Sequence, residues 1–236
     1  MEIEHKDGPV VILSGAGLSA ASGVPTFRDA DGLWEGHRVE EVATPAAWFR
    51  DRPLVRDFYD QRRIACARVK PNPGHTALAR LQEEWGPDQV VLVTQNIDGL
   101  LTQAGASEVI EMHGSLWHLK CEADDDHPRV AIEGPQDPAA CCSDCGALLR
   151  PDVVWFGEMP YAMGMIYAAL STCALFLSVG TSGLVYPAAG FTSQARTVGA
   201  YCVEINPNPV GGPFHQVLAE GSETALPRLV SAWLDG

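Results

Sequence analysis

Short apolar runs alternate with amphipathic stretches along the chain. The runs are rich in Val, Ile and Leu and predict five buried strands, at residues 10–13, 90–94, 109–112, 175–179 and 201–205. Apolar positions at helical spacing predict helices over residues 75–85 and about 224–234. Buried strands separated by helices are typical of a parallel sheet covered on both faces. We therefore predict an α/β fold with a Rossmann-like parallel sheet.

Residues 121–145 interrupt this alternation, because they are acidic and show no clear period. Four of the chain's seven cysteines lie there: Cys121, Cys141, Cys142 and Cys145. In a chain without a recognisable secretory signal, such crowding favours a metal site over a disulfide framework. We predict a catalytic domain formed by residues 1–118 and 148–236, with a small zinc-ribbon-like module inserted at 119–147.

Residues 159–195 contain no charged side chain and no histidine, which superficially suggests a membrane span. However, glycines and prolines interrupt them, and a spanning helix needs about 20 continuous apolar residues. We expect a buried helix, a buried strand and a glycine turn instead. With no secretory signal in the first residues, we expect a cytoplasmic protein and no membrane partner.

Charge restricts the classes of partner further. The chain of 236 residues has a net charge of −14, which argues against nucleic acid or an anionic membrane surface. Residues 121–145 alone carry seven acidic residues against one arginine, a net charge of −6. Much of the excess therefore lies in the predicted insertion and not at the predicted sheet edge.

A glycine motif follows the first predicted strand. Gly15, Gly17 and Ala20 match the dinucleotide fingerprint G-x-G-x-x-A, whose small residues let backbone amides approach a pyrophosphate. A structural turn without a ligand is the alternative. Gly23 and Pro25 end the helix early, and no acidic residue ends a second strand about 20 residues later, which disfavours a hydride-transferring Rossmann enzyme. The loop that follows could cover a cofactor.

Polar residues follow the next two strands at the same predicted sheet edge. Gln95, Asn96 and Asp98 come after the second strand, and His113 comes after the third. Amide and carboxylate side chains are costly to bury unless they hold something. An Asx-type helix cap and a structural histidine are the alternatives. At a ligand-binding edge, one imidazole can serve as a base near neutral pH.

At this point the sequence resembles the sirtuins, a family of NAD-dependent protein lysine deacylases. Six segments carry the resemblance in the family's order: GAGLSAASGVPTFRDADGLW at 15–34, TQNIDGL at 94–100, MHGSLW at 112–117, LLRPDVVWFGEMP at 148–160, SVGTS at 178–182 and EINP at 204–207. The resemblance implies residues that bind NAD, namely Gly15, Ala16, Gly17, Ala20, Thr26, Phe27, Arg28, Trp34, Gln95, Asn96, Ile97, Asp98, His113, Gly180, Thr181, Ser182, Asn206, Asn208 and Ser222.

The resemblance also implies the chemistry, which is ADP-ribosyl transfer. The acyl-lysine amide oxygen attacks C1′ of the nicotinamide ribose, and nicotinamide leaves. His113 acts as general base, with Asn96 and Asp98 as the other catalytic residues. The products are free lysine, nicotinamide and O-acyl-ADP-ribose. The strand implied to pair with the substrate peptide consists of Val154, Trp155, Phe156, Gly157 and Glu158.

A pair of side chains on a predicted helix suggests which acyl group is removed. Tyr59 and Arg62 are three residues apart and share a face. A solvated arginine and a half-buried tyrosine are the alternative interpretation. The spacing resembles the class III sirtuins, where such a pair binds the carboxylate of a succinyl, malonyl or glutaryl chain and a small residue, here Ala47, leaves room for it. We therefore expect acidic acyl groups to be preferred and acetyl to be accepted.

The metal site implied by the family is incomplete in this sequence. Members commonly have two Cys-x-x-Cys pairs, whereas only the pair Cys142 and Cys145 is intact here. A zinc site with Cys121 then needs Cys141 or Asp124 as its fourth ligand, and a metal-free module is the competing interpretation. A zinc ion here is expected to be structural.

We expect acyl-lysine side chains of proteins as partners and a monomeric chain. A plain deacetylase or a mono-ADP-ribosyltransferase remains an alternative activity for the same site. A module that binds an NAD metabolite without turnover is the alternative from another class, although His113 and Asn96 disfavour it.

Overall fold

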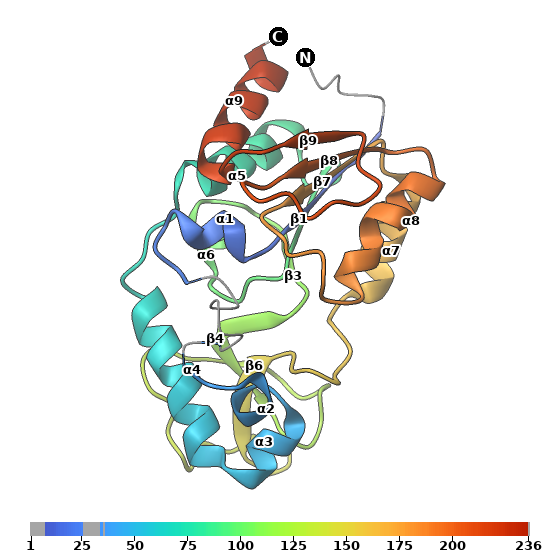
Figure 1. Cartoon of the computed structure of the whole chain (residues 1–236). Coiled ribbons are helices and arrows are strands. Elements are labelled where there is room, and N and C mark those ends of the chain that lie inside the picture. Colours follow the sequence, from blue (N-terminus) through green and yellow to red (C-terminus); the bar gives the residue numbers. More distant parts are fainter. Residues whose placement is uncertain (1–7, 26–33, 35, 236) are drawn as a thin grey trace.

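The computed structural model describes residues 8–25, 34 and 36–235. Its main sheet has six parallel strands in the order β3-β2-β1-β7-β8-β9 (Figure 1). The strands are β1 Val10–Ser14, β2 Val90–Thr94, β3 Val109–Glu111, β7 Leu175–Val179, β8 Tyr201–Ile205 and β9 Gln216–Leu218. The chain builds outward from β1 on one side and then from β7 on the other, so the strand order reverses between these two strands. Ligands of open α/β sheets bind at such a reversal.

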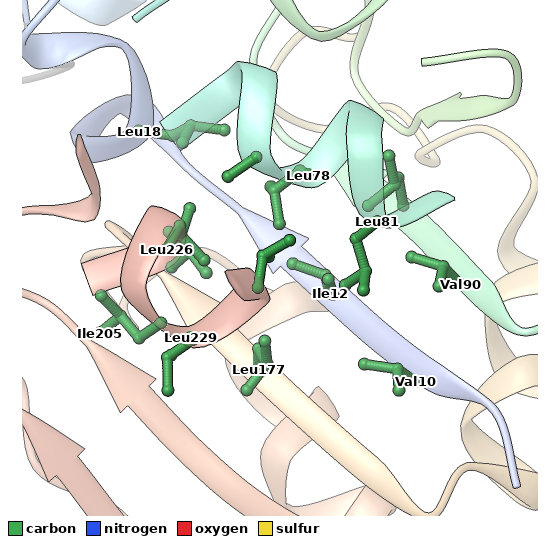
Figure 2. Packing of buried hydrophobic residues seen from close by; sticks show 14 of the residues in the cluster. Val10, Ile12, Leu18, Leu78, Leu81, Val90, Leu177, Ile205, Leu226 and Leu229 are labelled. Carbon is green, nitrogen blue, oxygen red and sulfur yellow. The ribbon is translucent and has the colours of Figure 1, made fainter. Parts of the chain in front are cut away.

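Alternate residues of β1 point to the two faces of the sheet. Val10 and Ile12 join a core with helices α5 and α9 (Figure 2), whereas Val11 and Leu13 join a core with α7 and α8. Both faces of a parallel sheet are thus covered, as its continuous apolar strands require. The helices around the sheet are α1 Ala16–Ala20, α5 Pro73–Trp85, α6 Leu100–Gln103, α7 Met163–Thr172, the short 3-10 helix η1 Ala188–Gly190, α8 Phe191–Thr197 and α9 Ser222–Asp235.

A second group of elements lies below the carboxyl edge of the sheet in Figure 1. It contains a three-stranded antiparallel sheet in the order β5-β4-β6. Three helices share one buried cluster with β4 and β6. The elements of this group are α2 Val39–Val42, α3 Pro45–Arg50, α4 Arg52–Cys66, β4 Gly114–Cys121, β5 Val130–Ala131 and β6 Leu149–Val153. The predicted boundary between residues 118 and 119 lies inside β4, and the division of the chain into domains stays a prediction.

The α/β fold predicted from the sequence is confirmed. The five expected strands and both expected helices are present, with small shifts at their ends. Strand β9 was not expected, because its three residues carry no period. One expectation is wrong: β6 ends at Val153, and residues 154–158 lead into a turn and do not form a strand. Among the described residues, no helix is long and apolar enough to cross a membrane.

Candidate functional site

Two glycine loops meet at the carboxyl ends of β1 and β7. The amide of Gly17 donates to the carbonyl of Gly180 at 2.9 Å, and the amide of Gly15 donates to Val179. A Cβ on Gly17 would lie 2.6 Å from the Cα of Gly180, so the contact leaves no room for a side chain. The predicted early end of the first helix is also confirmed, because α1 stops at Ala20. The glycines therefore serve this close approach of the two loops.

We expect Gly17→Ala to lower the free energy of unfolding by about 1–3 kcal/mol, because the added methyl group collides with backbone and not with a movable side chain. Thermal unfolding measures the change. Gly164→Ala is the matched control, since Gly164 lies in α7 with open space around its Cα. Equal unfolding temperatures for the two variants would contradict this account of the loop.

Asn96 and Asp98 converge on one hydroxyl group. The Oγ of Ser19, on α1, donates to Asp98 at 2.7 Å and accepts from the Asn96 amide at 3.1 Å. The same amide nitrogen donates to the carbonyl of Gly15 at 3.0 Å. The other Asp98 oxygen accepts from the amide of Leu100, which forms an Asx turn just before α6, whose N-cap residue is Gly99. The structure thus connects the polar cluster to the glycine motif.

His75 completes this network, although no motif in the sequence pointed to it. It lies in the first turn of α5, is fully buried, and its Nε2 is 3.3 Å from the Ser19 hydroxyl. Burial lowers its pKa to about 4, so the ring is neutral at physiological pH. Burial also raises the pKa of Asp98. Glu111 lines a small cavity together with His75 and Asp98. Burial raises the pKa of Glu111 to about 7, and the negative charges of Asp98 and Asp152 add to this shift.

His113 lies in the turn between β3 and β4, where the main sheet passes into the second group of elements. Its Nδ1 is 3.1 Å from the carbonyl oxygen of Gln95. A carbonyl can only accept, so Nδ1 carries the proton and Nε2 of the neutral ring is free to act as a base. Burial lowers the pKa of His113, and the contact with the Gln95 carbonyl partly offsets that shift.

Most other predicted NAD residues lie around the same edge. Gln95 and Thr181 line a cavity of about 170 Å³. The side-chain amide of Asn206 donates to the carbonyl of Thr181 at 2.9 Å, and Ser222 is buried at the start of α9 within 3.4 Å of the Gly17 carbonyl. Gly180 is partly exposed there, whereas Ala20, Ser182 and Asn208 are exposed. Thr26, Phe27 and Arg28 lie outside the described residues.

The predicted acyl-binding residues come together with Trp34 and Trp155, and we call these five the acyl cluster: Trp34, Ala47, Tyr59, Arg62 and Trp155. The Arg62 guanidinium lies over the Trp34 ring at 4.3 Å, and the indole of Trp155 donates to the Tyr59 hydroxyl at 2.9 Å. Burial is the main reason that the pKa of Tyr59 is raised, so its phenol is neutral. Trp34, expected among the NAD residues, packs against α4, and Ile97 packs against the same core.

Residues 154–158 border this cluster. The amide of Val154 donates to the carbonyl of His113, and that of Phe156 donates to the carbonyl of Ala43. The Glu158 carboxylate accepts from the amide of Trp155 at 2.8 Å and pairs with Arg150. Gly157 has a φ of 94°. These contacts fix the segment as a turn beside His113.

Four potential metal ligands gather at the end of β4, and we call them the cysteine cluster: Cys121, His127, Cys142 and Cys145. Their ligand atoms all lie within 4.8 Å of one another. The structure differs from the sequence expectation at the fourth position, which His127 fills. Cys141 is exposed and its thiol contacts the Ala139 carbonyl, while Asp124 lies 3.7 Å from the outer nitrogen of His127. His127 was missed because its spacing matches no Cys-x-x-Cys pattern.

Comparison with known proteins agrees with this geometry. The model of the Sir2 family matches residues 15–187. The chain belongs to the Sir2 family. A Sir2 relative from Shigella flexneri, named NAD-dependent protein deacylase, is 47% identical over 232 residues, which are 96% of this chain and 84% of the relative.

Solved Sir2 structures share the fold. A Sir2 homolog–NAD complex has a TM-score of 0.87 at 33% identity and covers 97% of this chain and 91% of its own. A Sir2 complex with an inhibitor, 2′-O-acetyl-ADP-ribose and a deacetylated peptide has a TM-score of 0.77 at 26% identity, with 95% and 93% covered. The resemblance recognised in the sequence is therefore confirmed.

Proposed function

We propose that this chain is an NAD-dependent protein lysine deacylase. The observation that carries the proposal is the junction of the two glycine loops with Asn96, Asp98 and His113 at the reversal point of the sheet. The Sir2 relatives named NAD-dependent protein deacylase support it. Incubation of the protein with NAD and an acyl-lysine peptide, read by product mass, tests it, and the absence of released nicotinamide would contradict it.

The residues fit NAD. The loops at Gly15, Gly17 and Gly180 lie at the carboxyl ends of β1 and β7, where the strand order reverses, a place that suits the pyrophosphate of a dinucleotide. Bound NAD supplies a ribose carbon from which nicotinamide can leave. Asn96 uses its amide N–H groups on Gly15 and Ser19 and keeps its carbonyl oxygen as an acceptor. His113 offers Nε2 to a ribose hydroxyl proton, because Nδ1 is engaged by Gln95.

The substrate is, in our proposal, an acyl-lysine side chain whose acyl group is acidic. Arg62 supplies a fixed positive charge beside the Tyr59 phenol, and an arginine fork suits a terminal carboxylate. The peptide backbone docks along residues 154–158. A panel of acetyl-, succinyl-, malonyl- and glutaryl-lysine peptides separates the alternatives: higher kcat/KM for the acidic groups supports the proposal, and a preference for acetyl supports a plain deacetylase.

The cysteine cluster holds, in our proposal, one structural zinc ion. Thiolate sulfur and imidazole nitrogen in a group of four are the ligand set that tetrahedral zinc prefers. The Asp124 carboxylate lies 3.7 Å from the outer nitrogen of His127. Cys121 is the last of the eight residues of strand β4, which begins directly after His113, so we expect the metal to supply stability and not chemistry.

We expect purified protein to contain one zinc ion per chain and His127→Ala to weaken zinc affinity by more than about tenfold, because losing even a residue that only orients a ligand costs 10- to 100-fold. Competition with a chromogenic chelator measures the affinity. Cys141→Ala is the control and should retain the affinity of the original protein, since its thiol faces the Ala139 carbonyl. Unchanged zinc affinity in the His127 variant would exclude His127 as a ligand.

A further inference from the structure

Glu122 joins the cysteine cluster to two helices of the second group. It follows Cys121 directly, and its carboxylate is largely buried, with 16% of the side chain exposed. One oxygen accepts from the indole nitrogen of Trp48 at 2.8 Å. The guanidinium of Arg52 contacts both oxygens, at 3.1 and 3.2 Å from one nitrogen and 3.3 Å from another. The carboxylate thus has three donor groups and a two-oxygen contact with arginine.

These partners come from the corner between α3 and α4. Trp48 is in α3, and Arg52 is the first residue of α4, so only Asp51 separates the two helices. The Arg52 guanidinium also lies 5.6 Å from the centre of the Trp48 ring. Glu122 therefore fixes the indole of Trp48 from one side while Arg52 covers it from another.

Trp48 in turn contacts the acyl cluster. Its ring centre is 5.9 Å from that of Trp155, whose indole donates to the Tyr59 hydroxyl. Ala47, the small residue of the acyl cluster, precedes Trp48 in α3. A displacement of Trp48 must therefore be absorbed by Trp155 and Tyr59, since all are buried and closely packed.

The position of Glu122 is set by the cysteine-rich segment. Its amide donates to the carbonyl of Leu148 at 3.0 Å, which extends the pairing of β4 with β6 by one residue. The sulfur of its neighbour Cys121 lies 3.5 Å from that of Cys145. The carboxylate is therefore attached to the part of the chain that holds the cysteine cluster together.

We propose that Glu122 is a positioning residue for acyl-lysine binding, which acts by holding Trp48 against the acyl cluster. This inference rests on the function proposed above. It links the metal-binding segment to substrate affinity through a single carboxylate. A purely local ion pair is the competing account, and it predicts lower thermal stability without a selective change in substrate affinity.

Two variants of the full-length, zinc-loaded protein distinguish the accounts. Glu122→Ala removes the contacts with both Trp48 and Arg52, whereas Glu122→Gln retains an acceptor for Trp48 and loses the ion pair with Arg52. Below the unfolding temperature of every variant, we expect Glu122→Ala to raise KM for a succinyl-lysine peptide about tenfold and Glu122→Gln about threefold, with KM for NAD unchanged. Glu133→Ala, which removes an exposed acid from the same segment, is the matched control and should change neither constant.

Direct titration calorimetry of the succinyl peptide should show the same ratio of affinities. Unchanged peptide affinity in both variants, or an equal loss of NAD and peptide affinity, would overturn the role of Glu122. If Glu122→Ala does not fold, Glu122→Gln decides, because loss of the ion pair with Arg52 should still weaken peptide binding about threefold, and unchanged peptide affinity in that variant would overturn the proposal. If the wild-type protein binds the peptide without deacylating it, the proposed function is wrong. The role of Glu122 is then tested by the peptide affinities of the variants alone.

Discussion

We expect His113→Ala to lower the rate of lysine deacylation by about 10²- to 10⁴-fold, the usual contribution of a general base. The Gln95 carbonyl fixes the tautomer of the imidazole, so alanine removes the proton acceptor at Nε2 and leaves the glycine loops in place. Because nicotinamide leaves before the proposed proton transfer, nicotinamide exchange should fall less than the formation of O-acyl-ADP-ribose. Both rates can be followed by mass spectrometry of one reaction mixture.

The pH dependence of the deacylation rate is a second test of His113 as the general base. Burial lowers the pKa of His113, so the base form is present at neutral pH and activity should fall only as pH drops through that lowered pKa. Glu111 has a pKa of about 7 and titrates in a range that could obscure this limb. Glu111→Gln removes that ionisation and should leave the acid limb in place. A limb that disappears with Glu111 would mean that the glutamate, and not His113, controls the rate at low pH.

Much of the fold could be predicted from the sequence because its strands are buried on both faces. Runs such as residues 175–179 and 201–205 are apolar except for Ser178 and Glu204, which are buried as well, and only a covered parallel sheet accepts such runs. The short strand β9 escaped prediction, since three half-exposed residues produce neither a period nor an apolar run. The strand expected at 154–158 was carried over from the family resemblance, whereas in this chain the Glu158 carboxylate accepts from the Trp155 amide and pairs with Arg150, which fixes a turn.

The candidate site was predicted where residues follow strand ends and missed where side chains arrive from helices. Asn96 and His113 could be found from their place along the chain. Ser19 and His75 could not, because their contact depends on how α1 and α5 pack over the sheet. His127 was missed for a similar reason, since the loop after β4 brings it back to Cys142 with its Nδ1 3.3 Å from that sulfur. The spacing of residues along the chain does not show which distant side chains the fold brings into contact.

The choice of Arg62 over its neighbour for acyl recognition follows from what Arg63 does. Arg63 is fully buried and donates to the Leu116 carbonyl, to Asp60 and to the Gly134 carbonyl. The Arg63 guanidinium is therefore engaged by buried partners within the fold and does not face the acyl cluster. Arg62 is partly exposed, lies over the Trp34 ring and stands beside Tyr59, so its charge faces the acyl cluster. The cation–π contact with Trp34 orients the guanidinium.

We expect Arg62→Met to lower kcat/KM for a succinyl-lysine peptide by about 30-fold or more and to change that for an acetyl-lysine peptide about threefold at most. Truncating one partner of a desolvated charge pair costs about 2–5 kcal/mol, whereas an acetyl group has no carboxylate to lose. Methionine retains much of the apolar contact with Trp34 and Phe58, which limits the structural effect. Steady-state kinetics with both peptides at saturating NAD measure the ratio.

Two further variants separate geometry from charge. Arg62→Lys keeps the charge but not the planar fork, so its succinyl activity should lie between that of the original protein and that of Arg62→Met. Arg56→Met removes a positive charge from the same helix and should leave the succinyl-to-acetyl ratio unchanged. If Arg62→Met and Arg56→Met lower the succinyl-to-acetyl ratio by the same factor, general electrostatic attraction and not a specific contact with Arg62 explains any preference for acidic groups. A loss confined to the succinyl peptide and to Arg62 assigns that preference to one side chain in a chain whose net charge is −14.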